Sequence, residues 1–278
     1  MSLRRVDQRA KGYLYLRGRM LDVRRKSMQP MGERLGVDYQ QLQQFVSSSS
    51  WKVEPVRREL AKLAVETIHP EAWVIDDTGF KKVGTSSPCV ARQYSGTLGK
   101  VGNCQIGVSV HAATDAASCP LNWRLFVPES WDDTCADSND TAAMIQARRQ
   151  KAEIPDTVRH RTKWALALET IDELASWGLR PPVAVADAGY GEITAFRLGL
   201  TNRSIPYVLA VKSSTTAHPA DRVPEKIETT GRGHPVFARY RSKPSSLREL
   251  ARVARRRQLH QVTWRSGFAD TRKCHRNR

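Results

Sequence analysis

The chain has 278 residues, of which 40% are hydrophobic, and its 45 Lys and Arg outnumber its 28 Asp and Glu, giving a formal net charge of +17. This composition excludes wholesale disorder, and the absence of a run of about 18 uncharged apolar residues excludes a membrane-spanning helix. Five scattered cysteines without a Cys-x-x-Cys pair argue against a disulfide framework or a zinc site. The basic N-terminus lacks the apolar core of a secretory signal, so we expect a soluble, cytoplasmic protein.

The positive charge is concentrated at the two ends of the chain. Residues 1–26 hold nine Lys and Arg against two acids, and residues 239–278 hold thirteen against two, whereas the residues between them are nearly neutral. Two cationic ends around a neutral body are typical of a protein that grips a polyanion, and nucleic acid is the partner we expect. The alternative is a solvated surface or a disordered basic tail.

Apolar residues at helical spacing predict helices in the first 70 residues, among them an amphipathic helix from Val53 to Ile68 that ends before Pro70. The serine run Ser47–Ser50 predicts a loop and an N-cap for that helix. This basic helical region is either a DNA-binding module or a helical cap on the main domain.

After Pro70 the pattern changes to short strands, a glycine-rich hairpin and helices. The expected strands are 72–75, 89–94, 105–111, 123–127, 183–187 and 207–211, the hairpin turn lies at 96–102, and the expected helices are 138–177 and 194–200. The strands at 72–75, 183–187 and 207–211 are apolar enough to be buried. These elements predict an α/β fold, with a mixed sheet flanked by helices.

Beyond Lys212 the sequence becomes rich in Ser, Thr, Pro and Gly. A short basic helix at 247–257 and a strand at 259–264 are expected there, followed by residues 266–278, which are polar and basic without a core pattern. We therefore expect a helical region at 1–70, a core at 71–212 and a third region at 213–278.

Two aspartates are the most informative candidate site residues. Asp76 and Asp187 each follow a short apolar run, which predicts that each stands at the end of a buried strand. If those strands are neighbours, the two carboxylates can share one Mg²⁺ or Mn²⁺, which suits hard oxygen ligands and phosphoryl transfer. The alternative is that Asp187 caps the following helix and Asp76 begins a turn.

Other catalytic patterns are absent. Residues 94–101 lack the glycine and the Ser or Thr of a phosphate-binding loop, and the sequence holds neither HExxH nor GxSxG. The cations near the first aspartate and the glycine-rich turn suit contacts with DNA phosphates, although single surface charges are the simpler interpretation: Lys81, Lys82, Arg92 and Lys100.

Several motifs in order resemble insertion-sequence transposases of the DDE type, described as DDE-superfamily endonucleases. They are Asp76-Asp-Thr-Gly-Phe-Lys-Lys82, Ala91–Gly107, Leu125-Phe-Val-Pro-Glu-Ser-Trp-Asp132, Thr162-Lys163, Ala186-Asp-Ala-Gly-Tyr-Gly191 and Pro206–Val211. The motifs extend over about half of the chain, and a weaker likeness covers the N-terminal helical part.

The resemblance implies a ribonuclease-H-like fold in which Asp76 and Asp187 are the first two catalytic acids and metal ligands, with Asp77 as the fallback for Asp76. It also implies Mg²⁺- or Mn²⁺-dependent attack by water on a strand at the element's end, followed by attack of the freed 3′ hydroxyl on target DNA. The implied partners are double-stranded DNA, as terminal repeats and target, and further copies of the chain in a synaptic complex. The implied location is the bacterial nucleoid.

The sequence departs from the family pattern at its C-terminus. The family has a third acid, a Glu, on a later helix, and none of Glu225, Glu228 and Glu249 lies in that context. Residues 213–278 resemble the start of an inserted β-rich region, and residues 268–278 leave the pattern. We therefore expect a truncated or frameshifted copy with impaired cleavage. The alternatives are a non-catalytic relative that occupies element ends and inhibits transposition, or a basic nucleic-acid-binding protein whose aspartates are only caps.

Overall fold

The computed structural model describes residues 3, 5–21, 26–96, 99–219, 221–225 and 238–254, and the backbone of 259–266 and 271–277. The chain divides into two compact units, the first comprising Met1–Ala186 and Ala195–Val208 and the second Asp187–Thr194 and Leu209–Arg278. In the part of the chain that the structure describes, no helix combines the length and the apolar character that crossing a membrane requires.

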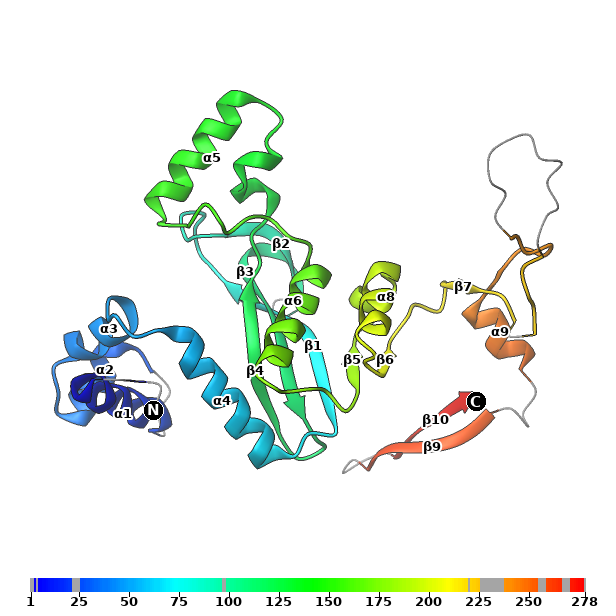
Figure 1. Ribbon diagram of the computed structural model, residues 1–278, viewed down its shortest axis with the longest axis horizontal. Coiled ribbons are helices and arrows are strands. Elements are labelled where there is room, and N and C mark those ends of the chain that lie inside the picture. Colours follow the sequence, from blue (N-terminus) through cyan, green and yellow to red (C-terminus); the bar gives the residue numbers. More distant parts are fainter. Residues whose placement is uncertain are drawn as a thin grey trace. The chain divides into compact units, whose positions relative to one another are not determined.

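The first 70 residues are helical, as predicted (Figure 1): α1 (Val6–Met20), α2 (Met28–Leu35), α3 (Tyr39–Ser47) and α4 (Val53–Ile68). Helices α1, α2 and α3 pack on one another, with Met31, Leu42 and Phe45 buried among them. The predicted serine cap of α4 is wrong. The Ser47 and Ser48 hydroxyls donate instead to carbonyls one turn earlier in α3, so they serve the end of that helix.

The first unit is built on a mixed sheet of β1 (Ala72–Lys81), β2 (Ala91–Ser95), β3 (Lys100–Ala113), β4 (Ser118–Leu125), β5 (Ala184–Ala186) and β6 (Tyr207–Leu209). The strand order is β2-β3-β1-β5-β6, and β4 also pairs with β3. β1 runs antiparallel to β3 and parallel to β5. This mixed sheet, flanked by helices and preceded by a helical region, confirms the predicted ribonuclease-H-like α/β fold class.

Three strands differ from their predictions. β1 does not end at Asp76, because β3 supplies antiparallel partners as far as the Lys81–Cys104 pair. β4 begins at Ser118 rather than Trp123, since it forms a hairpin with the end of β3. β6 is not buried: Tyr207 and Val208 are exposed because β6 is the last strand of the order.

The glycine-rich segment forms the predicted hairpin between β2 and β3. Ser95 pairs with Lys100, and the turn between them closes through Gly99, whose φ of +63° favours glycine. Thr97 and Leu98 lie outside the described residues.

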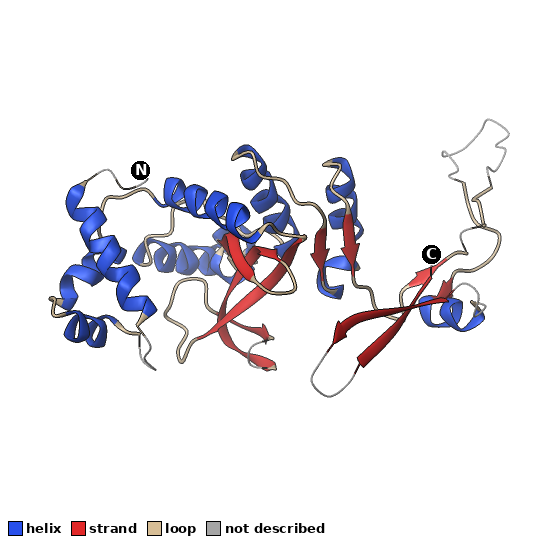
Figure 2. Ribbon diagram, turned by 90° about the horizontal axis from the view of Figure 1, so that it is seen from below, coloured by secondary structure: helices blue, strands red, loops and turns tan. Residues whose placement is uncertain are grey.

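The helical stretch predicted at 138–177 is two helices, α5 (Asn139–Lys151) and α6 (Lys163–Ser176). Helix α6 packs against β3 and β4, and α4 also packs against β4, so both cover the sheet (Figure 2). Helix α8 (Thr194–Asn202) approaches α6 closely, because a Cβ at Gly199 would lie 2.4 Å from Leu168.

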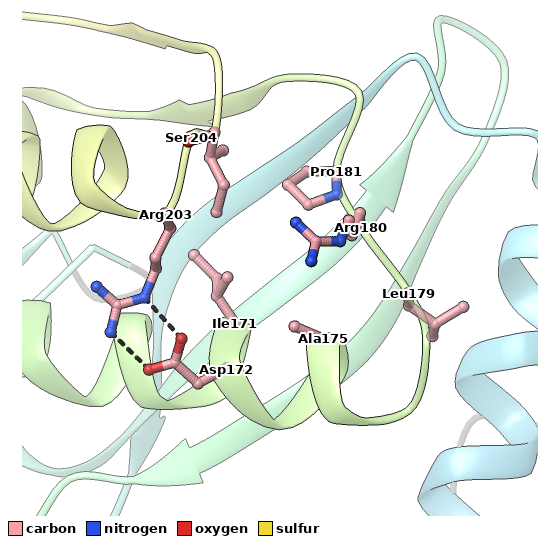
Figure 3. A pocket seen from close by; sticks show the side chains of 9 residues that line it. Ile171, Asp172, Ala175, Leu179, Arg180, Pro181, Arg203 and Ser204 are labelled. Carbon is pink, nitrogen blue, oxygen red and sulfur yellow. Dashed lines mark hydrogen bonds and ion pairs between the residues drawn. The ribbon is translucent and has the colours of Figure 1, made fainter.

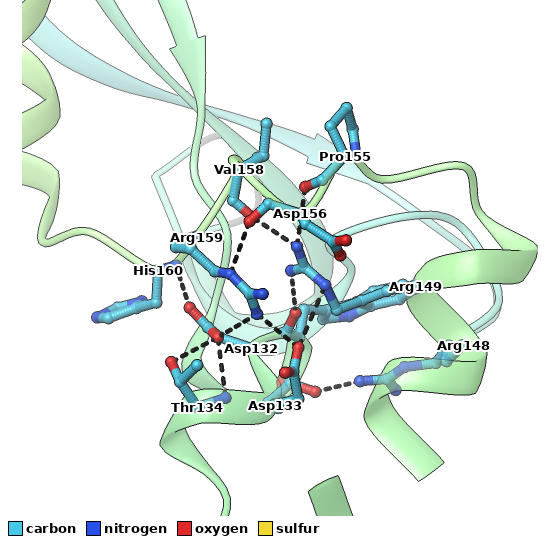
Figure 4. A network of polar contacts seen from close by, with 12 residues as sticks. Asp132, Asp133, Thr134, Arg148, Arg149, Pro155, Asp156, Val158, Arg159 and His160 are labelled. Carbon is cyan, nitrogen blue, oxygen red and sulfur yellow. Dashed lines mark hydrogen bonds and ion pairs between the residues drawn. The ribbon is translucent and has the colours of Figure 1, made fainter. Parts of the chain in front are cut away.

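The segment between β4 and α6 is held by a buried polar network (Figure 4). It contains two short 3₁₀ turns, η1 (Glu129–Trp131) and η2 (Asp133–Cys135), and α5. The Arg149 guanidinium is 2% exposed and donates to the carbonyls of Trp131, Pro155 and Val158. The chain between α5 and α6 is therefore held by hydrogen bonds to buried side chains, among them Arg149 and Asp132, rather than by helix.

The second unit contains α7 (Ala188–Gly191), β7 (Thr216–Ala217), β8 (Ser245–Ser246), α9 (Leu247–Val253), β9 (Leu259–Ser266) and β10 (Thr271–Asn277). Helix α9 and strand β9 lie where a helix (247–257) and a strand (259–264) were predicted, although α9 ends at Val253 and residues 255–257 lie outside the described residues. Residues 271–277, which show no core pattern, nevertheless pair as β10 with β9. A hairpin needs only backbone partners, so its strands can lack apolar alternation.

Candidate active site

The strand register at the β1–β5 edge carries the candidate site. Trp73, Val74 and Ile75 pair in parallel with Ala184, Val185 and Ala186. The last pair is Ile75 with Ala186, and the next residue along each strand is an aspartate, Asp76 or Asp187. The two strands are therefore neighbours, which is the condition for the hypothesis that the aspartates share an ion. Because Asp187 belongs to the second unit, the shared metal site itself stays a prediction.

Asp76 and Asp77 point to opposite faces of the sheet, since successive side chains of a strand alternate. Asp77 shares its face with the buried Trp73 and Ile75, whereas Asp76 is exposed on the other face. The Asp77 backbone N–H donates to Asp76 Oδ1 at 2.7 Å, which orients that carboxylate. Asp76 forms no ion pair within the described part of the chain, so its charge is open to an external cation.

Asp77, the fallback ligand, already has a cationic partner. The ammonium of Lys163, the first residue of α6, lies 2.6 Å from Asp77 Oδ2 and 5.5 Å from the centre of the Phe126 ring. Both members of the pair are half-buried. This ion pair gives Asp77 a role in tying α6 to β1, and it favours Asp76 over Asp77 as the ligand.

Two polar residues on β3 lie beside Asp76, and sequence patterns alone did not point to them. The Ser109 hydroxyl donates to the Asp76 carbonyl at 3.2 Å and lies 3.1 Å from Nε2 of His111. Burial lowers the pKa of His111, while the negative charge of Asp76 opposes that shift. In a strand, residues 109 and 111 lie on the same face, so the alternation of β3 groups Ser109 with His111. That alternation places the two residues beside Asp76 only once the pairing of Asp76 with Ser109 is known.

Asp187 has the capping role that was its alternative interpretation. It is the N-cap of α7, and its Oδ1 accepts the Gly189 N–H at 2.9 Å. A Cβ at Gly191 would lie in collision with the Ala210 carbonyl oxygen, so the Ala186–Gly191 motif requires glycine there for close backbone approach. A cap uses one carboxylate oxygen, so capping and metal binding are compatible uses of Asp187.

The described glutamates after Asp187 are engaged in local structure. Glu192 accepts from Lys212 at 2.6 Å, and this bond lowers the pKa of Glu192. Glu225 pairs with Arg241, and Glu249 closes the capping box of α9. Glu228 lies outside the described residues.

The carboxylates of Asp76 and Asp187 have the chemistry that fits a hard divalent cation, and their use together stays a prediction. Among the described residues, no group of three or more His, Cys, Asp or Glu side chains is arranged to hold a metal ion. Asp76 and Asp187 supply the oxygen ligands that Mg²⁺ and Mn²⁺ prefer, and both ions commonly keep water in their remaining positions.

The predicted DNA-binding cations lie at one end of the sheet, along residues 100–104 of β3, but not all on the same face. The register places Arg92 opposite Asn103, on the same face of the sheet as Asp76, and Lys81 opposite Cys104, on the other face. Lys82 follows β1, and its N–H donates to the Asn103 carbonyl. Lys100 lies at the start of β3, beside the hairpin turn. Arg92 therefore shares a face with Asp76, but six residue steps along β3, about 20 Å of strand, separate its partner Asn103 from Ser109, the partner of Asp76.

A pocket of about 240 Å³ lies in the first unit, beside the residues that precede β5 (Figure 3). It is lined by Leu179, Arg180 and Pro181 before β5, by the end of α8, and by the face of α6 that carries Asp172. Asp172 is paired with Arg203 at 2.5 Å across the pocket wall. Because it opens at the amino end of β5, whereas Asp187 follows the carboxyl end, we assign it no part in the candidate site.

Comparison with known proteins supports this assignment of the fold. The chain is 29% identical over 206 residues to a protein of Microchaete diplosiphon described as a probable transposase for insertion sequence element IS701. The aligned part covers 73% of this chain and 48% of the relative, so the chain spans about half the length of the relative it matches. A family model described as DDE superfamily endonuclease matches residues 1–271, and the match passes Phe268, where the C-terminal departure was expected. The chain belongs to the DDE superfamily endonuclease family.

Proposed function

We propose that this chain is a DNA transposase that cleaves and transfers strands at insertion-sequence ends in a reaction that depends on a divalent metal. The observation that carries the proposal is the β1–β5 register, in which the paired residues Ile75 and Ala186 are each followed by an aspartate. The family match and the transposase relative support it.

Asp76 and Asp187 would hold the cation, Mg²⁺ or Mn²⁺. When bound, such a cation supplies charge neutralisation at the reacting phosphate. The chain's own contribution is positioning. The Asp77 N–H orients the Asp76 carboxylate, the Ser109 hydroxyl fixes the Asp76 carbonyl, and the Gly189 N–H orients the Asp187 carboxylate. Lys163 neutralises Asp77, which removes a competing negative charge from the neighbouring residue.

The proposed partner is double-stranded DNA, as terminal repeats and as target. The net charge of +17 favours phosphate binding. The predicted cations, which the register places along residues 100–104 of β3, would contact phosphates further along the duplex, about 15–30 Å of strand from Asp76: Arg92, Lys81, Lys82 and Lys100. We also propose assembly of several copies in a synaptic complex and location on the bacterial nucleoid.

We propose a separate role for each of the three regions of the chain. Residues 1–70 would bind DNA, residues 71–212 would carry the catalytic core, and residues 213–278 would begin a β-rich insertion.

A second function is favoured by one observation. Within the described residues, the glutamates that follow Asp187 are bonded to Lys212, Arg241 and Ser246, and none is presented as a third acid. The corresponding proposal is a relative that binds element ends without cutting them and so inhibits transposition.

The test is Mg²⁺-dependent nicking of duplex DNA that carries the genomic sequences on either side of the gene. Asp76→Asn and Asp187→Asn should each lower the nicking rate by at least about 100-fold, whereas Asp115→Asn, an exposed acid in the β3–β4 turn, should not. Tight binding of the same DNA with no nicking by the unmodified chain would support the second function. Nicking that persists in Asp76→Asn would overturn the first.

A further inference from the structure

Helices α2 and α3 are joined by a turn of three residues, Gly36, Val37 and Asp38. Gly36 has a φ of +66°, which favours glycine, and its N–H and that of Val37 close the end of α2 on the Gly32 carbonyl. Asp38 then caps α3, since its Oδ1 accepts the Gln40 N–H at 2.9 Å. The turn therefore ends one helix and starts the next within three residues.

The two helices also touch at a position where only glycine fits. A Cβ at Gly32 would lie 2.8 Å from the Val37 carbonyl oxygen and 2.8 Å from the Cβ of Tyr39. A small residue in the first helix, a left-handed glycine in the turn and a capped second helix together make a helix-turn-helix unit.

Helix α3 is buried on one side only, and the rest of its surface, which includes Tyr39, Gln41 and Val46, is exposed. Leu42 and Phe45 are buried, and Phe45 packs against α1 where Gly12 leaves room for its ring. Gln40, Gln43, Gln44 and Ser47 are exposed and follow the i, i+3, i+4, i+7 spacing of a single stripe. Packing of α3 on α1 and α2 thus leaves a stripe of amide side chains facing outward.

The chemistry of this stripe suits the edges of base pairs. A glutamine amide offers a donor and an acceptor side by side, which matches N7 and N6 of adenine in the major groove. Helix α3 carries no charged side chain, whereas exposed cations on α1 and α2 of the same unit can contact the flanking phosphates: Arg17, Arg19 and Arg34. In sequence-specific binding, neutral amides contact the base edges while the surrounding cations contact the phosphates. Helix α3 and its neighbours carry both kinds of side chain.

We propose that α2 and α3 form a DNA-reading helix-turn-helix in which α3 enters the major groove and Gln40, Gln43 and Gln44 contact adenine-containing base pairs. This rests on the proposed function in that it takes duplex DNA as the partner. It adds the element that reads sequence and the bases that it prefers.

The test selects duplexes from a 20-bp random-sequence library with the full chain in EDTA, so that metal-dependent cleavage plays no part. The unmodified chain should enrich a motif with adenine at one or more fixed positions. Gln40→Ala, Gln43→Ala and Gln44→Ala should each lower discrimination at their own position by roughly 5- to 150-fold. Gln146→Ala, the same change at an exposed site on α5, is the matched control and should leave the motif unchanged.

A phosphate contact should behave differently from a base contact. Arg17→Ala should weaken binding to all duplexes equally and reduce the slope of log affinity against log salt by about 1. Circular dichroism of each variant verifies that the helices are intact. Enrichment of no motif, or of a motif that survives the three glutamine changes together, would overturn the proposal and favour a protein partner for this face. Because the selection is free of metal, its outcome is independent of whether Asp76 and Asp187 support cleavage.

Discussion

Two aspartates of this chain, Asp132 and Asp76, have contrasting surroundings. Asp132, in the segment between β4 and α6, is 1% exposed and accepts hydrogen bonds from Thr134, Arg159 and the His160 backbone. Asp76, on β1, is exposed and forms no ion pair within the described residues. A carboxylate whose bonds are all supplied by the protein holds structure, whereas one that faces solvent is available to an external ligand.

The hydrogen bonds of Asp132 also change its acidity. Burial raises the pKa of Asp132, but the donors from His160, Thr134 and Arg159 outweigh it and lower the pKa to about 2. The surroundings of the two aspartates therefore predict different responses to mutation. Substitution of Asp132 should reduce stability, and substitution of Asp76 should reduce ligand binding.

The largest effect on stability is expected for Asp132→Ala. It removes the acceptor of four hydrogen bonds and leaves the Arg159 guanidinium with Asp133 as its only carboxylate partner among the described residues. The free energy of unfolding should fall by about 3–5 kcal/mol, measured by urea denaturation. Asp137→Ala, an exposed acid in the same segment, should change it by no more than about 0.5 kcal/mol. Equal losses in the two variants would contradict the structural role of Asp132.

A smaller effect is expected from acid. The pKa of Asp132 is lowered in the folded state, so its contribution to stability is complete above the unfolded pKa near 4 and is lost as the pH falls toward 2. We expect the unmodified chain to lose about 2 kcal/mol more than Asp132→Asn between pH 4 and pH 2. Denaturant titrations of both chains at several pH values measure this difference. Parallel curves would show that Asp132 is not the group responsible.

The smallest effect on stability is expected for Asp76→Asn. The Ser109 bond is made to the backbone carbonyl of Asp76, and asparagine keeps an oxygen for the Asp77 N–H. The free energy of unfolding should therefore change by no more than about 0.5 kcal/mol. A loss of several kcal/mol would mean that Asp76 is a structural acid like Asp132, and the contrast between the two regions would fail.

The sequence predicts the fold well where local patterns determine it. The helical N-terminal region follows from apolar spacing, and the strands that lead to Asp76 and Asp187 follow from two short apolar runs. Those runs do not show that β1 and β5 are neighbours, which only the register does. The extent of β1 could not be predicted, because residues 76–81 are polar and become a strand only through pairing with β3. The break between α5 and α6 contains Pro155, a helix breaker that the sequence shows, and Arg149 then binds carbonyls 9 and 18 residues away, which leave no periodic pattern.

In the candidate site too, some residues could be predicted from the sequence and others could not. Asp76 and Asp187 stand out in the sequence because each follows an apolar run, and their roles stay a prediction. Lys163 lies 86 residues from Asp77, and Ser109 lies 33 residues from Asp76, so neither contact has a local sequence signature. Arg92 shares a face with Asp76 only because of the β2–β3 register.

The most direct test of the central claim is Mn²⁺ binding to the full chain, followed by electron paramagnetic resonance, for the unmodified protein and for Asp76→Asn, Asp187→Asn and Asp115→Asn. If Asp76 and Asp187 share one cation, each of their substitutions should weaken binding by at least about 10-fold, and Asp115→Asn should leave it unchanged. Equal Mn²⁺ affinity in all four chains would contradict the claim.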